Sequence, residues 1–349
     1  MGKIRTLHAG AIVAIFVASV GAQVAQVQQP SHPTTDADNV WTWAVQAQRP
    51  LQLTMDANNV WVRSGESPIL QYSYRHVPFK PYVKELYTPG GVNILLDAPP
   101  DHLHHHGLMF AVAANGVNYW EETSTAGRQT HLDFTKVEFT AHYQGPGTGY
   151  PIARFAERAY WRSAPPSPSR AVLSEVREVE AGRRPTPGTG APATVVTWKS
   201  ELTVAGDKQP VVLSGSHYFG LGLRFPRSMD GTGVFLNADG KEGTIFRGEE
   251  RLVRSNWCAY QVTVGGKAVT VAMFGYPSNP RGQTLWFTMA KPFAYMSATL
   301  GLHEQPLEVP AGQPLVLRYC VAAWDRHLLP AQIDAFYDEW TAVTRWKVN

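Results

Sequence analysis

Leu315-Val316-Leu317-Arg318-Tyr319-Cys320-Val321 is the stretch of this chain that most clearly decides how the chain folds. Its odd-numbered positions are all apolar, and Arg318 and Cys320 stand between them. Successive side chains of a β-strand point to opposite faces, so a period of two predicts a strand whose sheet has two different faces.

The rest of the chain from residue 51 repeats this design as many short apolar or alternating runs. Gly, Pro, Asn and Asp separate the runs, as in the turn signal Gly145-Pro146-Gly147. One long run, Val211–Arg224, predicts a single strand, and Gly182–Pro192 predicts a loop. Many short strands with turn residues between them predict an all-β fold, a large antiparallel β-sandwich.

One helix is expected at the C-terminal end, over residues 330–346. Ile333, Phe336, Tyr337 and Trp340 fall at helical spacing, and Pro330 stands near the start, where proline is favoured. We expect this helix to pack its apolar stripe on the sandwich. Residues 51–349 are therefore predicted to form one β-sandwich domain with a C-terminal helix.

The first 22 residues have the pattern of a secretory signal peptide. Lys3 and Arg5 precede the apolar run Ala9–Val20, and Val20-Gly21-Ala22 offers a cleavage site. The run is too short to span a membrane as a helix, although an uncleaved anchor is the alternative. Residues 23–50, rich in Gln, Thr, Pro and Asp, are predicted to be a linker. We therefore expect a secreted or periplasmic protein, with no membrane partner after signal cleavage.

The charge balance excludes one class of partner. Loss of Lys3 and Arg5 with the signal lowers the formal net charge by two, from +3 to +1. So small an excess does not favour binding to nucleic acid or to an anionic membrane. The two cysteines, Cys258 and Cys320, lie in strand-like apolar runs; export permits a disulfide between them, but two buried free thiols are favoured.

Histidines gather in the stretch Asp101–Gly107, which holds four of the twelve in the chain. Histidine is the side chain that titrates near physiological pH and is the commonest metal ligand. In an extended segment, His102, His104 and His106 would point to one side. His102 and His104 could then begin a metal site, with a third ligand from elsewhere; acid–base chemistry without metal is the competing interpretation.

Other side chains suited to chemistry lie both before and after this cluster. Trp120 and Glu121 combine an aromatic face with a carboxylate, a mixture that suits a sugar site. Arg224, inside an apolar run, needs a carboxylate or a polyhydroxylated ligand as its partner. Lys84 and Tyr87 could add donors to the same site; a surface lysine and a core tyrosine are the alternative.

The residues also resemble a known family. The anchors of the resemblance, which runs from about residue 70 to about residue 340, are Pro81–Gly91, Asp101–Leu108, Asn115–Trp120, Gly220–Arg224, Asn256–Tyr260 and Pro277–Arg281. On these anchors the chain resembles the PmoA-like family, exported proteins labelled "methane oxygenase PmoA". It is similar more loosely to mutarotase-like supersandwich proteins, which act on sugars. The resemblance implies a mutarotase-like supersandwich fold. It also implies arginine at the place of His106, which argues against a general metal site that uses His106.

Three functions follow as expectations. The first is an exported carbohydrate-processing enzyme, a glycan-active hydrolase, lyase or isomerase, acting on a small-molecule or oligosaccharide substrate without a cofactor. Its predicted catalytic residues are His102, His104, His105 and Glu121, and its predicted substrate-binding residues are Asp101, Trp120, Arg224, Tyr87 and Lys84. The second is a metal-dependent oxidase or oxygenase with a divalent or copper ion on His102 and His104. The third is a non-catalytic glycan-binding module.

Overall fold

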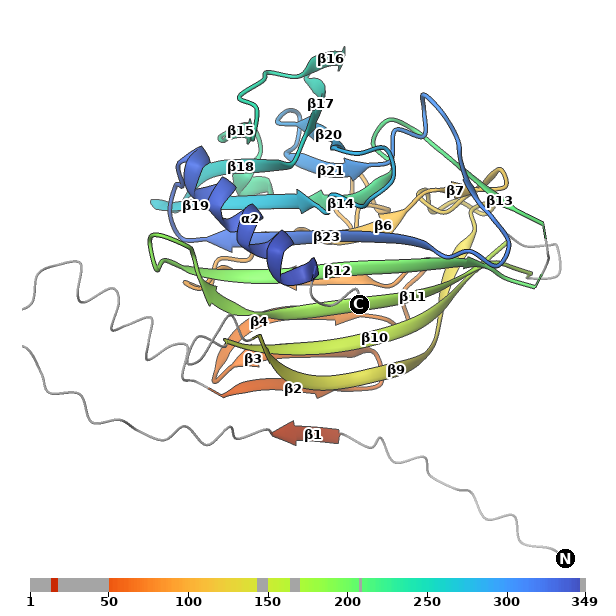
Figure 1. Ribbon diagram of the computed structural model, residues 1–349, viewed down its shortest axis with the longest axis horizontal. Coiled ribbons are helices and arrows are strands. Elements are labelled where there is room, and N and C mark those ends of the chain that lie inside the picture. The colour runs from red at the N-terminus through yellow and green to blue at the C-terminus, as the bar shows by residue number, and fades with distance from the viewer. Residues whose placement is uncertain (1–13, 18–49, 143–149, 164–169, 207–208, 346–349) are drawn as a thin grey trace, which may run out of the picture.

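The structure is a computed structural model that describes residues 14–17, 50–142, 150–163, 170–206 and 209–345. Apart from β1 (Ala14–Val17), which pairs with β2 (Leu51–Met55), the predicted signal peptide and almost all of the predicted linker lie outside the described residues. The described ranges form three antiparallel sheets (Figure 1).

The largest sheet, called the large sheet below, has eleven strands. In pairing order they are β1, β2, β3 (Asn59–Ser64), β4 (Ser67–Ser73), β5 (Tyr82–Leu86), β6 (Leu108–Ala111), β14 (Gly220–Arg224), β21 (Tyr295–Thr299), β20 (Thr284–Met289), β17 (Glu250–Ser255) and β16 (Thr244–Arg247).

The second sheet has eight strands and the third has four. The eight-stranded sheet runs β15 (Val234–Asn237), β18 (Trp257–Val264), β19 (Lys267–Gly275), β23 (Leu315–Trp324), β12 (Pro192–Val204), β11 (Ala171–Pro185), β10 (Tyr150–Arg162) and β9 (Arg128–His142). The small sheet runs β22 (Leu307–Val309), β13 (Val211–Ser214), β7 (Ala113–Ala114) and β8 (Val117–Asn118).

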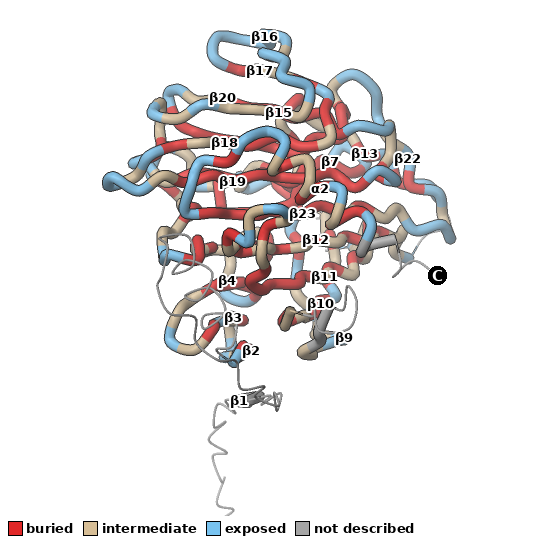
Figure 2. The backbone as a smooth tube through the Cα atoms, turned by 60° about the vertical axis from the view of Figure 1, so that its left-hand side comes forward, coloured by how far each residue is buried: buried red, intermediate tan, exposed pale blue. Residues whose placement is uncertain are grey.

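The large sheet and the eight-stranded sheet pack face to face around one hydrophobic core. Tyr72 of β4 contacts Phe155 of β10, with ring centroids 5.0 Å apart. Phe110 of β6 contacts Trp161 of β10 at 5.9 Å. Figure 2 shows buried backbone running through both layers, whereas the β16 end of the large sheet projects as an exposed hairpin. The predicted all-β class with large antiparallel sheets is therefore confirmed.

Strand β23 has the two faces that its alternation predicts. Leu317, Tyr319 and Val321 point into the core between the sheets. Cys320 and Trp324 lie on the opposite face, in a second buried cluster. Both faces are thus buried, but against different partners.

The partner of the second face is the C-terminal helix α2 (Pro330–Arg345), which confirms the predicted helix and its packing. Phe336 stacks on Phe274 of β19 at 5.4 Å, and Asp334 accepts a hydrogen bond from the indole nitrogen of Trp257 at 2.7 Å. Figure 1 shows α2 lying across the outside of the eight-stranded sheet. The described part of the chain has no helix of the length and apolarity needed to cross a membrane.

Two local predictions were wrong. The stretch 211–224 is not one strand: Ser214 ends β13 in the small sheet and Gly220 begins β14 in the large one. Gly215 (φ +153°) and Gly220 (φ +151°) take backbone conformations that only glycine adopts readily, and so allow the chain to change sheets. The predicted loop over Gly182–Pro192 is shorter, because β11 continues to Pro185.

Cys258 and Cys320 are both free and buried, as the favoured interpretation of the sequence has it. Burial raises the pKa of the Cys258 thiol well above its ordinary range and that of Cys320 to about 12.

Candidate functional site

The site begins with the alternation of β14, which has a core side and an outer side. Residues directly opposite each other in antiparallel strands project to the same side of the sheet. Leu221 pairs with Phe110 of β6, and Phe110 contacts Trp161 in the facing sheet. Leu221 and Leu223 therefore point into the core.

Gly222 and Arg224 consequently lie on the opposite side, called the outer face below. Arg224 pairs with Tyr295 of β21 and Gly222 pairs with Ser297, so these four positions share that face. Trp120, which follows β8, packs over Gly222: a β-carbon there would stand 3.0 Å from the Trp120 ring. The glycine lets the indole lie directly on the sheet backbone.

The histidine stretch is a pair of turns and not an extended segment. The His102 N–H donates to the Pro99 carbonyl at 2.8 Å, and the His105 N–H donates to the His102 carbonyl at 2.9 Å. The extended geometry in which His102, His104 and His106 would share one side is therefore not the geometry of this segment. The turn instead stacks His102 on His105 with centroids 4.7 Å apart and sets His104 edge-on to His105 at 4.6 Å.

Four buried side chains on the outer face each carry a polar atom without a hydrogen-bond partner, and we call them the inner cluster. The atoms are Nδ1 of His105, Nε1 of Trp120, Nε of Arg224 and Oη of Tyr295. The His105 ring lies 5.1 Å from that of Tyr295 and 6.3 Å from that of Trp120. Buried polar groups are nearly always paired, so four such atoms together make the inner cluster the candidate for a polar binding site.

Arg224 is held at the edge of this cluster by an aromatic ring. Its guanidinium lies 4.0 Å from the centre of the Phe293 ring, which in turn contacts His105 at 5.6 Å. Its Nη1 donates to the Ala294 carbonyl at 3.2 Å and approaches Asp230 at 3.5 Å. Burial lowers the pKa of Arg224, an effect that Asp230 only partly offsets.

Burial also lowers the pKa of His105, to about 2, with smaller contributions from His104 and His102. This imidazole is therefore neutral throughout the ordinary pH range. A neutral imidazole has one donor and one acceptor nitrogen, which suits hydrogen bonding to a hydroxyl group.

Partly exposed titratable groups surround the inner cluster, and we call them the rim: Asp101, His102, His104 and Glu121. His104 Nδ1 lies 3.5 Å from a Glu121 carboxylate oxygen. Burial lowers the pKa of His104, and the charge of Glu121 opposes this in part. Asp101 accepts from His102 at 3.0 Å and from the exposed Arg227 at 3.0 Å. The pairing with His102 lowers the pKa of Asp101.

His106 occupies a separate, buried position between two carboxylates. Its Nδ1 is 2.7 Å from Asp97 and its Nε2 is 2.9 Å from Glu122. Lys80 donates to Glu122 at 2.7 Å, and Tyr82 donates to Asp97 at 3.0 Å while its ring stacks on the imidazole. These five residues form a continuous chain, the His106 chain.

The two carboxylates decide the protonation of His106. Burial alone would lower the pKa of His106, but the hydrogen bonds to Asp97 and Glu122 outweigh it and raise the pKa. Burial would raise the pKa of Glu122, but His106 and Lys80 lower it. Protonated His106 and Lys80 carry two positive charges, which balance the negative charges of Asp97 and Glu122.

A second buried network, centred on Arg177, holds the backbone segment that carries Lys80 and Tyr82 of the His106 chain. Arg177 of β11, fully buried, pairs with Glu175 at 2.8 Å and donates to the Pro81 carbonyl at 2.9 Å. Pro81 stands between Lys80 and Tyr82. The core of the sandwich thereby fixes the backbone from which two members of the chain extend.

The structure brings seven of the sequence-predicted site residues together and leaves two, Lys84 and Tyr87, outside the inner cluster and the rim. Asp101, His102, His104, His105, Trp120, Glu121 and Arg224 belong to the inner cluster or the rim. Lys84 lies 3.8 Å from Asp97 and so borders the His106 chain. Tyr87 donates to Glu85 at 2.8 Å; burial, then this bond, raises the pKa of Tyr87 to about 12.

The predicted metal role of His102 and His104 stays a prediction. In the described ranges, no three or more His, Cys, Asp or Glu side chains are grouped so that they could hold a metal ion. A third ligand for the two histidines is therefore not identified there.

Sequence reasoning missed Tyr295, Phe293, Lys80 and Asp97 as members of the site and gave His106 no role in it. Tyr295 carries no local signal, because strand pairing brings it to the cluster from a distant segment. A signal for His106 was available in the sequence. A histidine that stands between two acidic residues near it in the chain, Asp97 and Glu122, can be predicted to hydrogen-bond to both.

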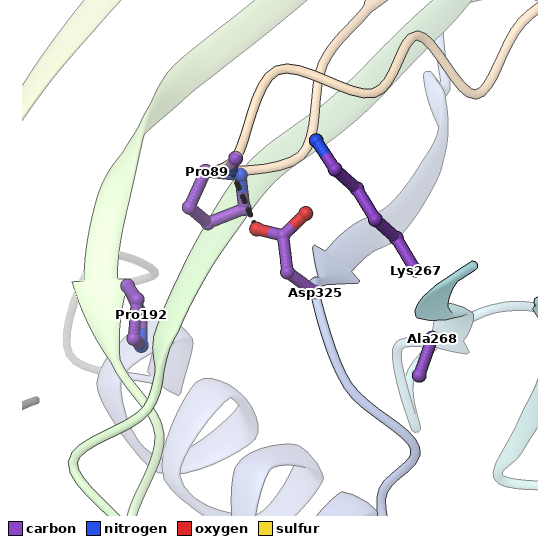
Figure 3. Close-up of a pocket in the computed structure, with 6 residues that line it drawn as sticks. Pro89, Pro192, Lys267, Ala268 and Asp325 are labelled. Carbon is purple, nitrogen blue, oxygen red and sulfur yellow. Dashed lines mark hydrogen bonds between the residues drawn. The ribbon is translucent and has the colours of Figure 1, made fainter. Parts of the chain in front are cut away.

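A separate depression of about 320 Å³ lies at another place on the surface (Figure 3). It is lined by Pro89, Gly90, Pro192, Lys267, Ala268 and Asp325, none of which belongs to the site. Asp325 accepts from the Gly90 N–H at 2.6 Å and from the Thr88 hydroxyl at 2.5 Å. These bonds tie the turn after β5 to the end of β23, which gives Asp325 a structural task.

Fold and site together define an all-β protein whose large antiparallel sheet carries a histidine- and aromatic-lined cluster on its outer face. The chain belongs to the family of unknown function DUF6807, whose family model matches residues 59–338. A comparison with curated proteins gives no match.

Solved structures give matches of low similarity. The α-galactosidase from Lactobacillus brevis matches with 8% identity and a TM-score of 0.44, over 81% of this chain and 40% of that one. The chain thus spans about two fifths of that enzyme. A putative aldose 1-epimerase from Klebsiella pneumoniae matches with 10% identity and a TM-score of 0.35, over 84% and 83% of the two chains. A putative mutarotase from Salmonella typhimurium matches with 10% identity and a TM-score of 0.30, over 79% and 94%.

Proposed function

We propose that this protein is an exported enzyme that processes a carbohydrate by acid–base chemistry, as a hydrolase, lyase or isomerase. The observation that carries the proposal is the inner cluster, where His105, Trp120, Arg224 and Tyr295 each hold a buried polar atom without a partner. A sugar ring offers apolar C–H faces and several hydroxyl groups. Aromatic walls with a few convergent polar atoms are the complementary surface.

The rim supplies the groups for proton transfer. His104, with its lowered pKa, is neutral near neutral pH and lies 3.5 Å from Glu121. A neutral imidazole beside a carboxylate can accept a proton from a substrate and return it to another atom. In this mechanism His104 and Glu121 move the proton, and His102 with Asp101 holds the turn that presents His104.

Arg224 is assigned to binding. Its guanidinium packs on Phe293, and its Nε is free to donate to a ring oxygen or a carboxylate of the substrate. The resemblance to PmoA-like proteins remains a prediction beside this proposal, as does export.

The experiment is an NMR assay of the purified protein against a broad set of mono- and oligosaccharides, since one spectrum records hydrolysis, elimination and isomerisation. We expect turnover of at least one sugar, with a loss of about a hundredfold or more in His104→Ala and Glu121→Gln. Leu103→Ala is the matched control, because Leu103 is exposed and stands in the same turn.

Other outcomes of this experiment would support a different function or mechanism. Sugar binding without turnover in the wild-type protein would identify a glycan-binding module. Turnover that both variants retain would remove His104 and Glu121 from the mechanism. Stoichiometric copper, iron or zinc in untagged protein, lost in His102→Ala, would support the oxidase alternative.

A further inference from the structure

The outer face continues beyond the inner cluster through a row of aromatic rings. Tyr218 contacts Trp120 with ring centroids 5.4 Å apart, and it also contacts His217 with ring centroids 5.0 Å apart. Burial, followed by the neighbouring charge of Glu121, raises the pKa of Tyr218. Tyr218 therefore borders the rim as well as the inner cluster.

His217 is fixed at both of its ring nitrogens. Its Nδ1 lies 3.1 Å from the Ser216 hydroxyl, and its Nε2 lies 3.0 Å from a Glu250 carboxylate oxygen. Arg247 pairs with the same carboxylate at 2.7 Å. The imidazole plane cannot rotate without breaking these bonds.

Phe246 lies parallel to this fixed imidazole, with centroids 3.7 Å apart and planes 21° from parallel. It belongs to β16, the exposed hairpin strand at one end of the molecule (Figures 1 and 2). The stacking holds the Phe246 ring in one orientation while 47% of the residue stays exposed. A large ring that is held rigidly yet left open is suited to pack against a ligand.

A polar atom without a partner completes the arrangement. Nδ1 of His303 is buried and has no hydrogen-bond partner. The His303 ring stands edge-on to Phe246 at 5.7 Å and to His217 at 5.9 Å. The same combination, an aromatic surface beside an unpaired imidazole nitrogen, marks the inner cluster.

We propose that Phe246, His217 and His303 form a second sugar-binding subsite, and that the substrate is an oligosaccharide and not a single sugar. The inference rests on the proposed function and names its substrate class. Three successive ring contacts separate Trp120 from Phe246. On this proposal the ligand lies along the row from Tyr218, which borders the rim, to Phe246, and it extends over more than one sugar ring.

The experiment compares glycan length with one substitution on β16. A glycan array carrying mono- to hexasaccharides of neutral and acidic sugars identifies the tightest ligand, and calorimetry then measures Kd for that glycan and for its terminal monosaccharide. We expect the oligosaccharide to bind at least tenfold more tightly than the monosaccharide. Phe246→Ala should weaken oligosaccharide binding about tenfold and leave monosaccharide binding unchanged.

Ile245→Ala is the matched control. Ile245 is the neighbouring exposed apolar residue, 62% exposed. It pairs with Arg251 of β17 and so shares the side of Arg251, opposite to that of Glu250, which binds His217. It should leave both affinities unchanged. Because both residues lie on an exposed strand, neither variant should impair folding.

The failures of the two proposals are distinguishable. Equal affinity for the oligosaccharide and its monosaccharide, or full oligosaccharide affinity in Phe246→Ala, would overturn the second subsite and leave the proposed function in place. Wild-type protein that binds no glycan on the array would contradict the proposed function, and the subsite with it.

Discussion

The hydroxyl oxygen of Tyr295 occupies the place where a β-carbon on residue 222 would have to stand. The two residues lie on neighbouring strands, two positions apart in register, and on the same side of the sheet. Tyr295 can therefore reach across the sheet to the inner cluster only because residue 222 is glycine. The absence of a side chain at position 222 of β14 thus determines where the hydroxyl oxygen of Tyr295 in β21 lies.

This relationship can be tested by a double-mutant cycle. Gly222→Ala should destabilise the protein by about 1–3 kcal/mol, because the added methyl group displaces Tyr295 and presses on Trp120. In the Tyr295→Phe background the same change should cost less, since the hydroxyl oxygen in its way is gone. Chemical denaturation of the four proteins gives the coupling free energy. A coupling near zero would mean that the two residues do not compete for this space.

Tyr295→Phe alone should stabilise the protein while it impairs ligand binding. The substitution removes a buried hydroxyl group that has no partner, so the free energy of unfolding should rise by about 1 kcal/mol. Affinity for the sugar ligand should fall, because the hydroxyl is assigned to the ligand. Tyr72→Phe is the control: the Tyr72 hydroxyl is bonded to Glu157 and Arg177, so its loss should destabilise the protein. A Tyr295→Phe variant that is also destabilised would show that this hydroxyl has a partner within the protein.

The His106 chain should make stability depend on pH, with a sign set by the raised pKa of His106. The folded protein holds this proton more tightly than the unfolded chain, whose histidine pKa is about 6.5. The resulting stabilisation is complete below that value and is lost as the pH rises through the folded-state pKa. Urea denaturation between about pH 6 and about pH 9 measures it.

His106→Arg separates this effect from other titrations. Arginine stays charged throughout that range and can pair with both Asp97 and Glu122, so the variant should keep its stability as the pH rises. His106→Leu should lose about 3 kcal/mol or more, because it leaves two buried carboxylates facing each other with Lys80 alone. An exposed control, His76→Arg, should reproduce the wild-type profile. A wild-type pH profile as flat as that of His106→Arg would contradict the assigned charge state.

The two thiols should be unreactive in the folded protein. Cys258 and Cys320 are buried with raised pKa values, and only an exposed thiolate reacts rapidly. An Ellman titration should detect almost no thiol in native protein and both thiols in guanidinium chloride. Native protein that reacts at once would mean that the cover formed by α2 opens readily over Cys320.

The fold class was predictable because its signals are local. The alternation around Tyr319 and the helical spacing of Ile333 to Trp340 each lie within one element. The break between Ser214 and Gly220 was not predicted, since an apolar run looks the same whether it stays in one sheet or changes to another. Its glycines were the only sign of the change.

The site was predictable only where its members are neighbours in the chain. His102, His104 and His105 stood out by density, and Trp120 and Glu121 by adjacency to one another. Tyr295 joins them through its pairing with Arg224, which no local pattern reveals. The geometry of the histidines was also beyond the pattern, because two turns stack rings that an extended chain would separate.

The two sides of β14 have separate roles, so odd-numbered and even-numbered positions of the strand serve different purposes. Leu221 and Leu223 are buried in the core between the sheets, whereas Gly220, Gly222 and Arg224 lie under the proposed ligand. A saturation scan of this strand should therefore produce two interleaved classes of variants. Changes at the odd positions should reduce the amount of folded protein without altering ligand preference, whereas changes at position 224 should alter the ligand preference of the protein that folds. Such a strand allows specificity to diverge among relatives while the interior stays the same.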